Sequence, residues 1–299
     1  MSPARTEHVR ILRPAEGVLA FYDGRVEGYR YSPDPNWVDE GAISLGVASY
    51  ALIEGEEALV YDTHVSVAHG ELIRRTLEAA GVRRITVLLS HWHLDHVAGN
   101  EAFADCEILA GARTDEHLRR HREAIEAGTL WGAPPIAPLV LPTQTYEGRM
   151  DLQLGQRSLE LIEVDIHSDD ATVIWDPERR LLFAGDTVED PITYVDEPDH
   201  LPQHLRDLER LRALDSELIL PAHGDPEAIA EGGFGPGLLQ ATTDYVQILQ
   251  RCREEPALRE VPLSELLAPS LDAGWVRWFE PYETVHRENV KTVLAAERA

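Results

Sequence analysis

The sequence is poor in lysine, in cysteine and in positive charge, and each shortage excludes a class of chemistry. Its one lysine, Lys291, follows no glycine-rich segment, which excludes a phosphate-binding loop of the Walker A type. Cys106 and Cys252 lie far apart with no Cys-x-x-Cys pair, so we expect no disulfide framework. This use of cysteine favours a reducing compartment, and we expect a cytoplasmic protein.

Long apolar runs are also missing. No stretch approaches the roughly 18 uninterrupted apolar residues of a transmembrane helix, and the amino terminus has no apolar signal segment. The 27 basic residues face 53 acidic ones, which gives a formal net charge of −26 at pH 7. So acidic a surface repels phosphate backbones and anionic lipids. We therefore expect no nucleic acid and no membrane as partner, and a small molecule as substrate.

The rest of the composition is that of a globular chain. With 299 residues, 43% of them hydrophobic, the chain can bury a full core. Apolar runs bounded by turn residues predict strands at 17–22, 46–53, 58–61, 84–89, 159–164, 171–175, 180–184 and 218–220. Helical spacing of apolar residues predicts helices at 68–80, 114–127, 204–214, 238–252 and 284–298. Between these elements, proline-rich 132–142 is predicted as a loop, and glycine-rich 232–237 as a linker or mobile loop.

One cluster of metal-binding side chains follows the predicted buried strand 84–89. Within six residues it contains His91, His93, Asp95 and His96. Imidazole and carboxylate are the ligands of a borderline divalent ion such as zinc. A structural zinc site would prefer cysteines and four protein ligands, and the cluster contains no cysteine. It therefore indicates an open, catalytic metal site.

Three further candidates each follow a predicted strand. They are His167, Asp186 and His223. Several strands that each end in a ligand-type side chain indicate one sheet edge that collects metal ligands. Histidines outside these motifs, among them His200 and His204, are expected to be structural or solvated.

These residues resemble the motifs of a known family. Ser90-His91-Trp92-His93-Leu94-Asp95-His96 is similar to the His-x-His-x-Asp-His motif of the metallo-β-lactamase superfamily. Gly185-Asp186-Thr187 resembles its Gly-Asp motif, and Pro221-Ala222-His223-Gly224 resembles its late histidine motif. The motifs occur in the family's order, and the resemblance covers roughly residues 15–230.

The resemblance implies the fold and its boundaries. The expected fold class is α/β, an αββα sandwich of two mixed sheets with helices on both outer faces. We assign residues 1–237 to a metallo-β-lactamase-like domain. Residues 238–299 are then a C-terminal helical extension packed on the same domain. The role of its tail, about 254–299, is left open between capping a pocket, forming a homodimer interface and covering the core.

The resemblance also implies the ligands of two metal ions. It assigns His91, His93 and His167 to the first ion. Asp95, His96 and His223 are assigned to the second ion, and Asp186 bridges the two. The expected ions are two Zn²⁺ per chain, with iron or manganese as alternatives.

Two other aspartates have roles to be tested. Asp95 is expected to be catalytic as well as a ligand, because it can carry the proton of the attacking water to the leaving group. Asp62 resembles the aspartate that closes the family's early hairpin. It is read either as a residue that orients a ligand by hydrogen bonding or as a turn aspartate.

The function implied is that of a zinc-dependent hydrolase. An activated hydroxide would cleave a small ester-like bond, such as a lactone or thioester. His167 is followed by Ser168-Asp169-Asp170 where many family hydrolases have Thr-Pro-Gly-His, which weakens assignment to the glyoxalase II branch. Two alternatives remain: a mononuclear iron oxidoreductase like the persulfide dioxygenases, and an inactive metal-binding fold. Trp131 and Trp275 are read either as pocket walls or as packing residues.

Overall fold

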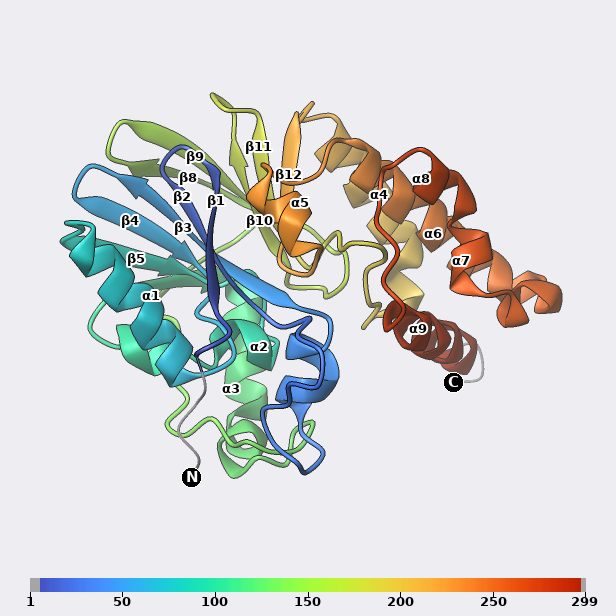
Figure 1. Cartoon of the computed structure of the whole chain (residues 1–299), viewed down its shortest axis with the longest axis horizontal. Coiled ribbons are helices and arrows are strands. Elements are labelled where there is room, and N and C mark those ends of the chain that lie inside the picture. Colours follow the sequence, from blue (N-terminus) through green and yellow to red (C-terminus); the bar gives the residue numbers. More distant parts are fainter. Residues whose placement is uncertain (1–5, 297–299) are drawn as a thin grey trace. The chain divides into compact units, whose positions relative to one another are not determined.

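The computed structural model describes residues 6–296 and has the mixed α/β architecture expected from the sequence (Figure 1). The strands form two mixed sheets, with the orders β1-β2-β3-β4-β5-β6-β7 and β12-β11-β10-β9-β8. By internal contacts the chain divides into two compact units, residues 1–161 and 162–299. The boundary falls within β9 (Arg157–Glu163). The division into domains after residue 237 stays a prediction.

The first unit contains the seven-stranded sheet, strand β8 of the five-stranded sheet and three α-helices. Its strands are β1 (Arg10–Ala15), β2 (Val18–Asp23), β3 (Val47–Glu54), β4 (Glu57–Tyr61), β5 (Arg84–Leu88), β6 (Glu107–Gly111), β7 (Gln144–Tyr146) and β8 (Arg149–Leu154). Its helical elements are η1 (Val38–Ile43), α1 (Val67–Ala79), α2 (Leu94–Val97), η2 (Asn100–Phe103) and α3 (Ala112–Ala127). The predicted strands and helices of this unit are present, with ends shifted by one or two residues.

Strand direction in this sheet brings the ends of β4 and β5 together. Strands β3 and β4 form a hairpin, in which Glu54 pairs with Glu57 and Gly55 takes a left-handed φ of 60°. Strands β4, β5 and β6 then run parallel. Because parallel strands end at the same edge, the residues after Tyr61 and Leu88 become neighbours.

Helix α1 faces the sheet with buried Ile73 and Leu77, which belong to the hydrophobic core of this unit.

A close backbone contact fixes the turn that follows α2. A Cβ atom added at Gly99 would lie 2.0 Å from the carbonyl oxygen of Thr63. Glycine at this position therefore lets the 63–66 segment approach the end of α2.

The second unit contains the end of the five-stranded sheet and most of the helices. Its strands are β10 (Thr172–Asp176), β11 (Leu181–Gly185) and β12 (Leu218–Pro221). Its helical elements are η3 (Pro198–His200), α4 (Leu201–Arg212), α5 (Pro226–Ala230), α6 (Gly237–Glu254), η4 (Pro256–Glu260), α7 (Leu263–Leu266), α8 (Ala268–Asp272) and α9 (Tyr282–Ala296). Helices α6 and α9 lie side by side (Figure 1), and the Tyr245 hydroxyl is 3.1 Å from His286 Nδ1 between them.

Two sequence predictions need correction or comment. The glycine-rich segment 232–237 is packed instead of forming a mobile linker, because Phe234 is buried and exchanges two backbone hydrogen bonds of 2.8 Å with Ile219. The predicted helix 284–298 ends at Ala296, and its last two residues lie outside the described range.

Among residues 6–296, no helix has both the length and the apolar composition needed to cross a bilayer.

We predict that Gly99→Ala destabilises the protein by about 1–3 kcal/mol, because the added methyl group would overlap the Thr63 carbonyl. The measurement is the free energy of unfolding in urea. Gly41→Ala is the matched control, since a Cβ at Gly41 meets no atom within 4 Å. Equal stability of the two variants would show that the contact at Gly99 imposes no constraint.

Candidate metal centre

The four predicted ligands of the first unit lie where β5 gives way to α2. The strand ends in buried Leu88, and an extended His93 (φ −63°, ψ 149°) caps the amino end of the short helix. The imidazole rings gather around His91, whose centroid is 4.5 Å from that of His93 and 4.3 Å from that of His96. Strand end and helix start thus bring three buried rings together.

Asp62 holds this cluster in a fixed orientation. Its Oδ1 accepts the backbone N–H of Ser90 at 2.6 Å, and its Oδ2 accepts Nδ1–H of His96 at 2.8 Å. Because Nδ1 of His96 carries the hydrogen that is donated to Asp62, the Nε2 lone pair of His96 is available to a metal ion. Burial raises the pKa of Asp62, and its contacts with His96 and Ser90 act in the opposite direction. The reading of Asp62 as a residue that orients a ligand agrees with this geometry.

Asp95 is beside His96 at the less buried side of the cluster. Its Oδ2 lies 3.5 Å from His96 Nε2, and its side chain is 15% exposed. Two ligands about 2.1 Å from a tetrahedral zinc lie roughly 3.4 Å apart. The separation of Asp95 and His96 therefore fits two ligands of one ion.

The three predicted ligands of the second unit meet at one sheet edge. Strands β11 and β12 run parallel, so Asp186 and His223 follow strand ends at the same edge. Strand β10 runs antiparallel to β11, which places His167, shortly before β10, at that edge too. All three side chains are buried.

Asp186 lies between the two histidines. Its Oδ2 is 3.6 Å from His167 Nε2 and 3.3 Å from His223 Nε2. Both separations again fit ligands that share an ion. Nδ1 of His167 donates to the carbonyl oxygen of Tyr194 at 3.1 Å, which leaves the Nε2 lone pair facing Asp186. One carboxylate next to two imidazoles is the arrangement that a bridging ligand needs.

Two residues of the candidate centre have a left-handed backbone conformation. Asp62 has a φ of 67° and His167 a φ of 70°. Residues without glycine's freedom adopt this region at a cost of about 1–3 kcal/mol, and such positions concentrate at functional sites. Both residues are held by the hydrogen bonds described above.

Glu189 is a buried carboxylate beside the ligand candidates His167, Asp186 and His223. The sequence analysis did not identify it. Its Oε1 accepts the backbone N–H of Tyr194 at 3.0 Å and lies 3.8 Å from His167 Nδ1. Its Oε2 accepts the Tyr282 hydroxyl at 2.8 Å. Burial raises the pKa of Glu189 to about 7, with Asp186 adding to the rise and His223 opposing it. Nothing in the local sequence Thr-Val-Glu-Asp-Pro distinguishes this glutamate from a surface turn residue.

The C-terminal helix α9 supports the loop that carries Glu189. Besides Tyr282, it contributes Asn289, whose Nδ2 donates to the Thr193 carbonyl at 2.9 Å. The Oδ1 of Asn289 accepts the backbone N–H of Val195 at 2.9 Å. One role of the C-terminal segment is therefore to hold residues 189–195 beside the candidate ligands of its own unit.

Aromatic rings surround His93 in the first unit. Trp131 is 48% exposed and stands edge-on to His93, with centroids 5.0 Å apart and an interplanar angle of 85°. Trp92, which is buried, lies 5.0 Å from Trp131 and stacks on His121 at 4.9 Å. An exposed indole beside a candidate ligand agrees with the reading of Trp131 as a pocket wall.

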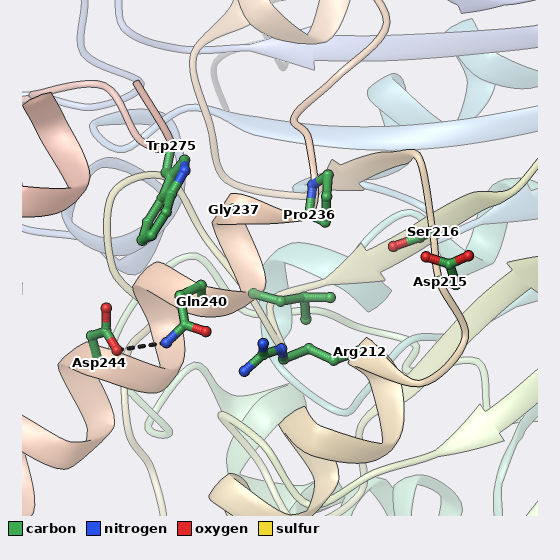
Figure 2. Close-up of a pocket in the computed structure, with 9 residues that line it drawn as sticks. Arg212, Asp215, Ser216, Pro236, Gly237, Gln240, Asp244 and Trp275 are labelled. Atoms are coloured by element: carbon green, nitrogen blue, oxygen red, sulfur yellow. Dashed lines mark hydrogen bonds between the residues drawn. The ribbon is translucent and has the colours of Figure 1, made fainter. Parts of the chain in front are cut away.

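A pocket of about 580 Å³ lies elsewhere in the second unit (Figure 2). Arg212, Asp215 and Gln240 line it with the ring of Trp275. No predicted metal ligand lines it, so the position of Trp275 here does not test its reading as a wall of the substrate pocket.

Comparison with known proteins identifies the family. The model of the metallo-beta-lactamase superfamily matches residues 43–223. The matched segment includes all seven predicted ligands.

Several curated proteins are similar over part of their length. The chain is 29% identical to "2,4-dinitroanisole O-demethylase subunit alpha" of Nocardioides sp. (strain JS1661), over 67% of this chain and 61% of that protein. It is 28% identical to "Atrochrysone carboxyl ACP thioesterase" of Aspergillus fumigatus, over 60% of this chain and 51% of that protein. The chain thus spans less than two thirds of the length of these relatives.

Solved structures share the fold. The DIM-1 metallo-beta-lactamase superposes with a TM-score of 0.60 at 18% identity, over 80% of this chain and 97% of that one. A metallo-beta-lactamase from Pontibacter korlensis gives a TM-score of 0.60 at 16% identity, over 80% and 99%. These similarities confirm the expected fold class.

We predict that Asp62→Asn lowers the affinity for Zn²⁺ by about 10- to 100-fold, because an amide no longer fixes the tautomer of His96. The measurement is competition for Zn²⁺ against a chromophoric chelator. Asp151→Asn, at an exposed position of β8, is the matched control. Unchanged affinity in Asp62→Asn would assign Asp62 to the turn alone.

Proposed function

Because this chain belongs to the metallo-β-lactamase superfamily, we propose that it is a hydrolase that uses two Zn²⁺ ions to cleave an ester-like bond, with an ester or thioester that bears a planar aromatic group as substrate. The observation that carries the proposal is the spacing of the ligands. Within each unit, imidazole nitrogens and carboxylate oxygens lie 3.3–3.6 Å apart, as ligands of shared ions do.

The donor set is that of a catalytic centre. By the family resemblance, His91, His93 and His167 would hold one ion, Asp95, His96 and His223 would hold the other, and Asp186 would contribute to both. Nitrogen and oxygen ligands without cysteine favour an ion that keeps a position open for water and substrate. When bound, two such ions lower the pKa of a shared water and polarise the substrate carbonyl.

The chain's own residues then handle protons and substrate. Asp95 is the least buried of the acidic candidates, so its carboxylate is in place to take the proton of the attacking water and pass it to the leaving group. Asp62 and the Tyr194 carbonyl hold His96 and His167 in the tautomers that present Nε2. No side-chain nucleophile is needed in this scheme.

The surroundings of His93 support an aromatic substrate class. The exposed ring of Trp131 offers an aromatic surface beside this ligand. Aromatic groups stack or meet edge-on at 4.5–7 Å with a gain of about 0.5–1.5 kcal/mol beyond burial. Two relatives are named as a thioesterase and as a subunit of a 2,4-dinitroanisole O-demethylase, an enzyme named for an aromatic ether.

The proposal is tested by metal content and hydrolysis together. We predict that the chain holds zinc and cleaves phenyl acetate and an aryl thioester, and that Asp186→Asn loses both zinc and hydrolysis. Asp151→Asn should keep both. One iron per chain with oxygen consumption on a persulfide, and no hydrolysis, would replace this function by sulfur oxidation.

We also predict that Trp131→Ala raises KM for phenyl acetate about 3- to 10-fold, from the loss of about 0.5–1.5 kcal/mol of aromatic contact. The KM for ethyl acetate should change much less. The control is Trp278→Ala, since Trp278 is an exposed tryptophan of the second unit. An equal change for both substrates would mean that Trp131 supports the loop and does not contact the substrate.

A further inference from the structure

A second group of metal-binding side chains lies within residues 162–299, outside the family's ligands. We propose that Asp165, Glu197, His200 and His204 bind a further divalent transition-metal cation, with Zn²⁺ as the ion that fits. Ligand atoms of Asp165, Glu197 and His204 lie within 4.8 Å of one another. His200 joins them through Nδ1, which is 2.8 Å from Asp165 Oδ2.

Local structure brings the four residues together. His200 caps the amino end of α4 and His204 lies one turn further, so residues four apart share a face of the helix. Asp207, on the next turn, accepts the backbone N–H of Asp165 at 2.8 Å. The helix thereby fixes the turn that carries Asp165, and Glu197 precedes the short η3 that leads into α4.

The side-chain atoms that face the proposed ion have no hydrogen-bond partner outside this cluster. His204 is 0% exposed, and neither ring nitrogen makes a hydrogen bond. Asp165 Oδ1 and Glu197 Oε2 are also buried without a hydrogen-bond partner, and the contact of His200 Nδ1 is the one with Asp165 Oδ2 inside the cluster. Buried polar atoms left unsatisfied cost about 1–3 kcal/mol each. Such a concentration in four residues calls for a ligand.

A proton does not satisfy the cluster as well as a metal ion does. A protonated His204 would bury two N–H donors that have no acceptor in hydrogen-bonding position. His204 Nε2 lies 3.5 Å from Asp165 Oδ1, which is close to the roughly 3.4 Å between two ligands of a tetrahedral zinc. Two imidazoles and two carboxylates also complete a four-coordinate shell.

The charge of the surroundings favours a cation. Burial, followed by the nearby carboxylates of Asp196, Asp169, Asp170 and Asp165, raises the pKa of Glu197 to about 9. A divalent ion would stabilise the charged carboxylates that the metal-free cluster disfavours. Because Asp165 precedes His167 by two residues, a bound ion would also fix the turn that carries this proposed catalytic ligand.

The experiment counts zinc per chain. Full-length protein is stripped with a chelator, saturated with Zn²⁺, passed through a desalting column and analysed by elemental mass spectrometry. Wild type should hold one zinc more than the double variant Glu197→Gln/His200→Ala. Both substituted side chains are partly exposed, so the fold should tolerate the changes, and circular dichroism checks this.

Two further variants keep the outcome decisive. His204→Gln should lose the same single zinc, while Glu209→Gln, an exposed charge change on the same helix, should lose none. The result is a difference between variants, so it does not depend on how many ions the catalytic candidates hold. Equal zinc in wild type, the double variant and His204→Gln would overturn the proposal, as would equal loss in Glu209→Gln.

Discussion

Imidazole nitrogens and carboxylate oxygens face each other across 3.3–3.6 Å at several buried positions of this chain. That separation exceeds the 2.7–3.2 Å of ordinary N–H···O hydrogen bonds. It matches the distance between neighbouring ligands of one cation. Keeping such pairs buried and fixed is the constraint that the surrounding structure serves.

The chain meets this constraint in the same way in both units. In each, a histidine gives Nδ1–H to a fixed acceptor, so that Nε2 points toward a carboxylate. For His96 the acceptor is Asp62, at the end of β4. For His167 it is the Tyr194 carbonyl, in a loop that α9 holds through Asn289. Strand ends supply the ligands, and more distant elements set their tautomers.

The sequence predicted what is local and patterned. Apolar runs located the central strands, and the tight spacing from His91 to His96 identified half of the candidate centre without further context. Strand β6 was missed because its short run, Glu107–Gly111, leads directly into helix α3 without a turn signal. Strand β8 was missed because only Leu154 of its six residues is buried.

Side chains whose role comes from distant contacts could not be predicted. Glu189 reads as a turn residue until Tyr282, far along the chain, donates to it. His200 and His204 read as isolated histidines because Asp165 approaches them only through the folded turn beside α4. Tertiary contact, which single-sequence patterns do not contain, decides the role of all three.

The acidic side chains of the second unit favour the binding of metal ions. Its carboxylates include buried Glu189 and half-buried Glu197, whose pKa values are raised to about 7 and about 9. Arginines pair with some acids of this unit, as Arg180 does with Asp215 and Arg253 with Asp199. Carboxylates whose charge is disfavoured in the metal-free state stabilise a bound cation. Metal binding should therefore contribute to the stability of this unit as well as to its chemistry, because an ion that binds only the folded state favours folding.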